Sequence, residues 1–218
     1  MKFCTAPLQC KAHAVKKLFV ALIVACAFAG NAYAGFKEGA TAYNAKNYSL
    51  ALKEIFPLAK AGDPQAQHLL GLMYYMGRGV TIDYRAALAW HRKAAEQGQA
   101  DAQYVVGAMY YTGNSVAADP AQAVTWFRRA ATKGHAPAQH ALALMYRYHA
   151  GGLPEDKVLA YLLLNLAATG GNANASQQRA EIARRMTQAQ IDEAQALTRA
   201  WHPGQPLPTS SRTGEPGE

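Results

Sequence analysis

The chain repeats itself with a period of 36 residues, and this repeat limits its possible folds more than any other feature of the sequence. Residues 66–98 read AQHLLGLMYYMGRGVTIDYRAALAWHRKAAEQG. Residues 102–134 read AQYVVGAMYYTGNSVAADPAQAVTWFRRAATKG and align with the first copy without a gap. A fixed period of this length is typical of stacked helix pairs, because one pair alone cannot bury its apolar face. The repeat therefore predicts an all-α solenoid.

Residues that start and stop helices divide each repeat into two helices. In the sequence 62–64, the glycine suits the left-handed position after a helix, the aspartate suits an N-cap and the proline suits a first turn. We expect a shortened repeat at 35–62, then repeats at 63–98, 99–134 and 135–170, of which the third diverges. Apolar residues at helical spacing predict helices at 36–45, 48–61, 64–76, 83–97, 100–112, 119–133 and 155–169.

The C-terminal third of the chain is expected to end the solenoid. The predicted helix 155–169 is apolar nearly all round, so it needs cover on two sides. Residues 174–201 supply two amphipathic segments, 175–186 and 188–200, which we interpret as capping helices. Residues 202–218 contain four prolines among glycine, serine and threonine, and this composition predicts a disordered tail.

Residues 1–34 have the pattern of a signal peptide. Lysines precede an apolar run of about a dozen residues at 18–29, which is too short to span a bilayer. Ala32-Tyr33-Ala34 then offers small residues at the two positions that signal peptidase reads. We expect cleavage between Ala34 and Gly35, no transmembrane segment in the mature chain, and a periplasmic or secreted location in a bacterium.

A second interpretation of the N-terminal segment involves lipidation. Residues 23–26 resemble a lipobox, in which Cys26 becomes the lipid-anchored N-terminus of a lipoprotein. The three cysteines of the chain, Cys4, Cys10 and Cys26, all precede the expected cleavage site. A chain cleaved after Ala34 therefore uses no disulfide and depends on packing for its stability.

The positive charge of the chain comes partly from this leader. The full sequence has 22 basic and 14 acidic residues, a net charge of +8. Four lysines and no acidic residue lie in residues 1–34, so the mature chain carries +4. No run of five basic residues occurs, and nucleic acid is therefore not expected as a partner.

A set of small and aromatic residues recurs at fixed places in the repeat: Ala66, Leu70-Gly71, Met73-Tyr74, Gly77-Arg78-Gly79-Val80, Asp83, Trp90 and Ala94-Ala95-Glu96-Gln97-Gly98. This pattern resembles the Sel1-like repeat family, and the next copy departs from it only where Ser115 replaces the second loop glycine. The resemblance covers about residues 36–201. It implies a right-handed α-solenoid of Sel1-like helix pairs, related to tetratricopeptide repeats.

The resemblance also implies a function. Members of the family are mainly adaptors, and exported bacterial members are associated with envelope assembly, polysaccharide secretion and the regulation of signalling. An alternative is a cell-wall-related ligand-binding protein or a β-lactamase-like hydrolase on the same scaffold. Family members linked to β-lactams have paired cysteines in each repeat, which a chain that begins at Gly35 lacks.

Most of the repeated residues suit structural roles. A glycine inside a helix costs about 1 kcal/mol relative to alanine, so the recurrence of Gly71 as Gly107 indicates a close approach between helices. Repeated aspartates at helix starts suit N-caps, and repeated tryptophans suit packing between repeats. The residues that we interpret as structural are Gly71, Gly77, Gly79, Asp83, Trp90, Gly98, Gly107, Gly113, Asp119, Trp126 and Gly134.

No local signature of catalysis or of a cofactor site occurs in the sequence. It lacks a phosphate-binding glycine loop, an HExxH motif and a Gly-x-Ser-x-Gly elbow. His68 and His140 lie on first helices two repeats apart, and Tyr104 occupies the equivalent place between them. Helices that pack about 10 Å apart hold such side chains too far apart for one metal ion. We therefore expect neither enzyme activity, nor a cofactor, nor a metal.

The expected function is the binding of a protein or peptide partner. In helix-pair solenoids, the first helices of successive repeats line the concave face. Tyrosine, histidine, glutamine and arginine on these helices are adaptable groups suited to recognition, although some could be exposed polar residues without a ligand. The candidate binding residues are Gln67, His68, Tyr75, Gln103, Tyr104, Tyr111, Gln139, His140 and Arg147.

Overall fold

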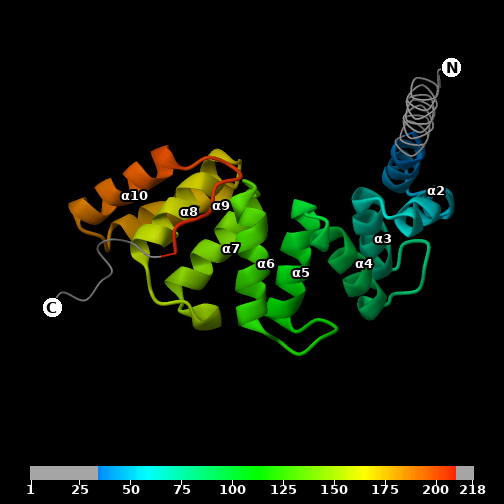
Figure 1. Cartoon of the computed structure of the whole chain (residues 1–218), viewed down its shortest axis with the longest axis horizontal. Helices are drawn as coiled ribbons and strands as arrows, with labels where there is room; N and C mark the ends of the chain where they lie inside the picture. Colours follow the sequence, from blue (N-terminus) through cyan, green and yellow to red (C-terminus); the bar gives the residue numbers. More distant parts are fainter. Residues whose placement is uncertain (1–33, 210–218) are drawn as a thin grey trace, which may run out of the picture.

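The computed structural model describes residues 34–209, and these residues form helices and loops without a strand (Figure 1). Residues 34–44 form the first described helix. The other helices are α2 (Tyr48–Ala61), α3 (Pro64–Met76), α4 (Tyr84–Glu96), α5 (Ala100–Thr112), α6 (Pro120–Thr132), α7 (Ala136–Arg147), the 3-10 helix η1 (Ala150–Gly152), α8 (Lys157–Thr169), α9 (Ala173–Ala183) and α10 (Gln188–Ala200). The predicted signal segment up to residue 33, with Cys26, and residues 210–218 lie outside the described part.

The helices pack in chain order as a stack of pairs. The closest pairings join the two helices of one repeat, α3 with α4, α5 with α6, and α7 with α8. Successive repeats meet through α2 and α3, α4 and α5, and α6 and α7. Figure 1 shows the pairs following one another along the long axis. The all-α solenoid predicted from the 36-residue period is confirmed.

The helix ends recur with the same period. The N-caps of the first helices α3, α5 and α7 are Asp63, Gln99 and His135, and each side chain accepts a hydrogen bond from a backbone N–H three residues on. Asp83 and Asp119 cap the second helices α4 and α6 in the same way. An oxygen or nitrogen acceptor at this place satisfies a backbone donor that the helix itself leaves free.

Two repeated glycines allow close packing. A Cβ atom on Gly71 would lie 2.8 Å from the ring of His91, and a Cβ atom on Gly107 would lie 2.7 Å from the ring of Phe127. Thus each glycine on a first helix makes room for an aromatic ring from the second helix of its own repeat. Gly79 has a φ of +75°, and its Cβ would lie 2.8 Å from a backbone oxygen of α2.

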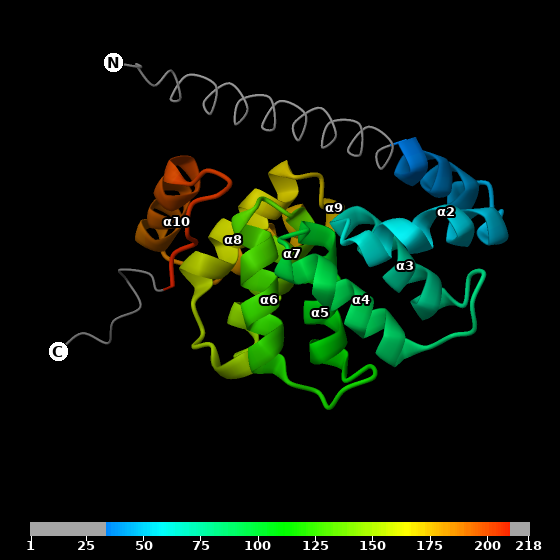
Figure 2. The same cartoon turned by 45° about the vertical axis from the view of Figure 1, so that its right-hand side comes forward.

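The largest apolar cluster surrounds α8 at the C-terminal end of the stack. Helices α9 and α10 both pack against α8 and cover its outer side (Figure 2). Ala175, Ile182 and Ala194 are the buried contributions of these two helices. An apolar helix therefore has neighbours on both sides, as its composition requires.

The segment that follows α10, residues 202–209, makes contacts with the helices. The backbone N–H of Gly204 donates to Thr132 O at 2.7 Å, and Arg128 Nη1 donates to Pro208 O at 3.3 Å. Leu207 is buried in the cluster around α8. Residues 202–209 therefore lie against α6 and the cluster around α8, whereas the composition of residues 202–218 predicts a disordered tail.

Candidate functional site

A groove runs across the first helices of three consecutive repeats. It has a volume of about 350 Å³ and lies between the helix 34–44, α3 and the start of α5. Its apolar side chains pack on the core between these helices, and its polar side chains stand at the rim. The lining residues are Phe36, Ala40, Tyr43, Asn44, Gln65, His68, Leu69, Gln99 and Asp101.

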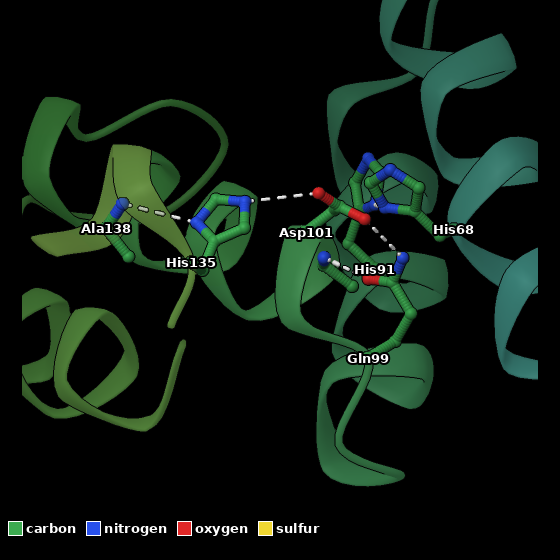
Figure 3. A network of polar contacts seen from close by, with 7 residues as sticks. His68, His91, Gln99, Asp101, His135 and Ala138 are labelled. Atoms are coloured by element: carbon green, nitrogen blue, oxygen red, sulfur yellow. Dashed lines mark hydrogen bonds and ion pairs between the residues drawn. The ribbon is translucent and has the colours of Figure 1, made fainter. Parts of the chain in front are cut away.

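Asp101 lies at the centre of a polar network on the rim of this groove (Figure 3). His135 Nε2 lies 3.1 Å from Asp101 Oδ1, and Gln99 Nε2 donates to Asp101 Oδ2 at 2.9 Å. His135 Nδ1 accepts from the backbone N–H of Ala138, so the hydrogen of this ring is on Nε2 and points to the carboxylate. The N-caps of α5 and α7 thus hold the Asp101 side chain in position.

Behind this network, two histidine rings share a hydrogen bond. His68 Nδ1 and His91 Nδ1 are 3.1 Å apart, and the ring centroids are 4.9 Å apart. His91 is fully buried, and within residues 34–209 its Nε2 has no hydrogen-bond partner. An unpaired N–H is costlier to bury than an unpaired ring nitrogen that carries no hydrogen. We therefore assign the hydrogen of His91 to Nδ1, which donates to His68.

Burial keeps both rings neutral near neutral pH. Burial, followed by the neighbouring His68, lowers the pKa of His91 to about 3. Burial also lowers the pKa of His68; Asp101 acts in the opposite direction, and His135 lowers the pKa further. Asp101 is therefore the lining residue that carries a charge at neutral pH, and this charge is negative. Across residues 34–209, no three His, Cys, Asp or Glu side chains converge as metal ligands.

The three glutamines predicted as binding residues are structural instead. Gln67, Gln103 and Gln139 are only 5%, 4% and 2% exposed. Each side-chain amide donates to a backbone carbonyl near the end of the preceding second helix, at 3.2, 3.0 and 3.2 Å. The prediction is wrong for these three residues because a long amide side chain can be buried when it hydrogen-bonds a carbonyl at a helix end. Each of these carbonyls also accepts a backbone N–H from the glycine that follows the helix.

The row formed by His68, Tyr104 and His140 is not a single continuous surface. His68 is half-buried against His91, whereas Tyr104 packs between Phe127 and His135 with ring centroids 5.7 and 5.2 Å apart. His140 Nε2 lies 2.7 Å from the side-chain oxygen of a glutamine on α9. Of this row, only His68 lines the groove.

The remaining predicted residues lie at the other end of the first helices, beside the loops. Tyr75 packs edge-on against Tyr84 with ring centroids 5.2 Å apart. Tyr111 is 51% exposed. Arg147 pairs with Glu181 of α9 at 3.4 Å. This row is separate from the groove, and α9 already engages its last member.

The polar network contains four side chains that were not among the predicted binding residues, namely His91, Gln99, Asp101 and His135 (Figure 3). Of the residues that line the groove, only His68 was predicted. The repeat register itself contains the signal for most of them. His91 aligns with Phe127 at a period of 36, which marks a core position, and Gln99 and His135 align with the N-cap Asp63. No such pattern marks Asp101, whose role depends on a neighbour 34 residues further along.

The stacked helix pairs and the groove along their first helices define the chain as an α-solenoid repeat protein. The family model for the Sel1 repeat matches residues 64–99, 100–135 and 136–172. The chain therefore belongs to the Sel1 repeat family. Sel1-repeat proteins generally act as scaffolds for protein–protein interactions. Within residues 34–209, no helix combines the length and apolarity needed to cross a membrane.

Two solved structures have similar folds. A Sel1 repeat protein from Oxalobacter formigenes is 30% identical with a TM-score of 0.63; the match covers 66% of this chain and 59% of that one. The protein c5321, a protective antigen of uropathogenic Escherichia coli strains with an SLR fold, is 33% identical with a TM-score of 0.65. That match covers 72% of this chain and 34% of c5321. The comparison with curated proteins found no match.

Proposed function

We propose that the chain is an exported adaptor of the bacterial cell envelope, which holds a segment of a partner protein in the groove between the helix 34–44, α3 and α5. The family supports a scaffold, and the signal-peptide pattern of residues 1–34 supports export. In the envelope, such an adaptor would bring its partner into an assembly or signalling complex. An adaptor of this kind needs no chemical reaction at the groove.

The observation that carries this proposal is the composition of the groove. Ligand sites usually combine an apolar surface with a few fixed polar groups. Here Phe36 and Leu69 supply apolar surface, and Asp101 supplies a carboxylate whose position is fixed by two neighbours. The groove is open at the surface, so an extended segment can enter it without a change in the fold.

Site-specific photo-crosslinking tests the location of this contact. A photoreactive phenylalanine analogue is placed at Gln65, an exposed position that lines the groove, in cells that express the full chain. The matched control is Gln122, an exposed glutamine on α6 and outside the groove. We expect a crosslinked protein in the envelope fraction from position 65 and none from position 122. Equal crosslinking at both positions, or crosslinking from position 122 alone, contradicts the proposal.

A further inference from the structure

The groove has an acidic rim on a chain that is basic overall. Asp101 is the one charged residue among the groove's lining residues, and its side chain is 62% exposed. The whole chain has a formal net charge of +8, which is +4 without residues 1–34. The two hydrogen bonds from Gln99 and His135 leave part of the acceptor capacity of this carboxylate free, because its two oxygens offer about four lone-pair sites.

The floor of the groove is apolar. Phe36, Ala40 and Tyr43 are partly buried against the core cluster that contains Leu69. The volume of about 350 Å³ lies at the lower end of the range for ligand sites. It has room for one large side chain and its backbone, but not for a folded domain.

Amide side chains lie beside this floor. Asn44 and Gln65 are exposed, and neither side chain has a hydrogen-bond partner within residues 34–209. A side-chain amide both donates and accepts, so it can pair with the N–H and C=O groups of an extended peptide backbone. The groove therefore offers an apolar contact, backbone partners and one negative charge.

From this arrangement we infer that the partner segment is an extended peptide with an apolar side chain followed or preceded by lysine or arginine. The apolar side chain packs on Phe36 and Leu69, and the basic group binds the free side of the Asp101 carboxylate. This inference rests on the proposed function and specifies the chemistry of the partner. Acidic segments and phosphate groups are disfavoured, because burial keeps His68 and His91 uncharged near neutral pH, and these rings do not offset the carboxylate.

Three pools of fluorescein-labelled peptides test this chemistry on the purified full chain by fluorescence anisotropy. The peptides are about ten residues long and span roughly 33 Å when extended. The first pool mixes Leu and Phe with Lys and Arg, the second mixes Leu and Phe with Asp and Glu, and the third mixes Ser and Gln with Lys and Arg. We expect the basic-apolar pool to bind about tenfold more tightly than the other two.

Substitutions of Asp101 test whether its carboxylate causes the preference for basic peptides. Asp101→Asn is expected to weaken binding of the basic-apolar pool by about two- to fivefold, as for an exposed ion pair. Asp101→Lys is expected to transfer the preference to the acidic-apolar pool. The matched control is Asp192→Asn, which changes an exposed aspartate on α10 and should leave the affinities unchanged. Circular dichroism confirms that each variant is folded.

The outcomes separate this inference from the proposed function. Equal affinities for the three pools, no binding of any pool, or an undiminished preference for the basic-apolar over the acidic-apolar pool in Asp101→Asn would overturn the partner chemistry. A crosslink from position 65 can still be obtained in those cases, so the adaptor function would stand. Conversely, a basic-apolar preference that Asp101→Lys reverses supports the chemistry even when crosslinking finds no partner.

Discussion

Replacement of His91 by phenylalanine is expected to remove much of the acid sensitivity of the fold. The chain itself suggests the substitution, because Phe127 occupies the equivalent position one repeat later and packs on Gly107 as His91 packs on Gly71. Phenylalanine fills a similar space but cannot bind a proton. The variant therefore changes the titration of this position while it keeps the packing.

The magnitude follows from the lowered pKa. The pKa of His91 falls from 6.5 to about 3 on folding, so between these two values the unfolded chain binds more protons than the folded chain. Stability from this group is complete above about pH 6.5 and is lost as the pH falls below that value. Between about pH 7.5 and pH 5, the loss is about 2 kcal/mol, a large fraction of an ordinary domain stability.

Urea unfolding followed by circular dichroism measures this effect at both pH values. We expect the free energy of unfolding to fall by about 2 kcal/mol more in the wild-type chain than in His91→Phe. The control is His202→Gln, which changes an exposed histidine and should retain the wild-type dependence. An equal fall in the wild-type chain and in His91→Phe would refute the assignment of a buried, neutral His91.

Three further predictions concern the packing of Gly71, the buried amide of Gln103 and the N-terminus of the exported chain. Gly71→Ala should lower the free energy of unfolding by about 1–3 kcal/mol, because the new Cβ would lie 2.8 Å from the ring of His91. The double variant Gly71→Ala, His91→Ala should show a non-additive recovery in the same urea assay. Gln103→Ala should cost about 1–3 kcal/mol by calorimetry or urea, since a buried side chain loses its packing and its hydrogen bond to the Ala95 carbonyl, although the N–H of Gly98 still donates there. Peptide binding should stay unchanged. Mass spectrometry of the exported protein should find an N-terminus at Gly35, and a lipidated N-terminus at Cys26 would contradict the signal-peptide prediction.

The architecture could be predicted because it depends on a 36-residue pattern that occurs twice in the sequence, at 66–98 and at 102–134. The helix predicted at 64–76 has those bounds in the structure, and so does the helix predicted at 100–112. Helix starts were predictable where the cap has an obvious residue such as Asp63. Gln99 and His135 are less usual caps, and only their register with Asp63 identifies them.

The site was less predictable because polarity alone does not show exposure. Glutamine recurs at positions 67, 103 and 139, and this recurrence marks the residue as part of the scaffold in the same way as the repeated glycines. The groove instead depends on residues that differ between repeats, such as Phe36 and Asp101. Their meeting requires the stacking of three helices, which no local spacing in the sequence expresses.

Hydrogen exchange of the chain, with and without the protein crosslinked from position 65, tests the central claim most directly. Binding in the groove predicts slower exchange in residues 34–44 and in the first turns of α3 and α5, with little change in the second helices α4 and α6. Protection confined to α4 and α6, or spread evenly over the solenoid, would contradict a partner site on the first helices.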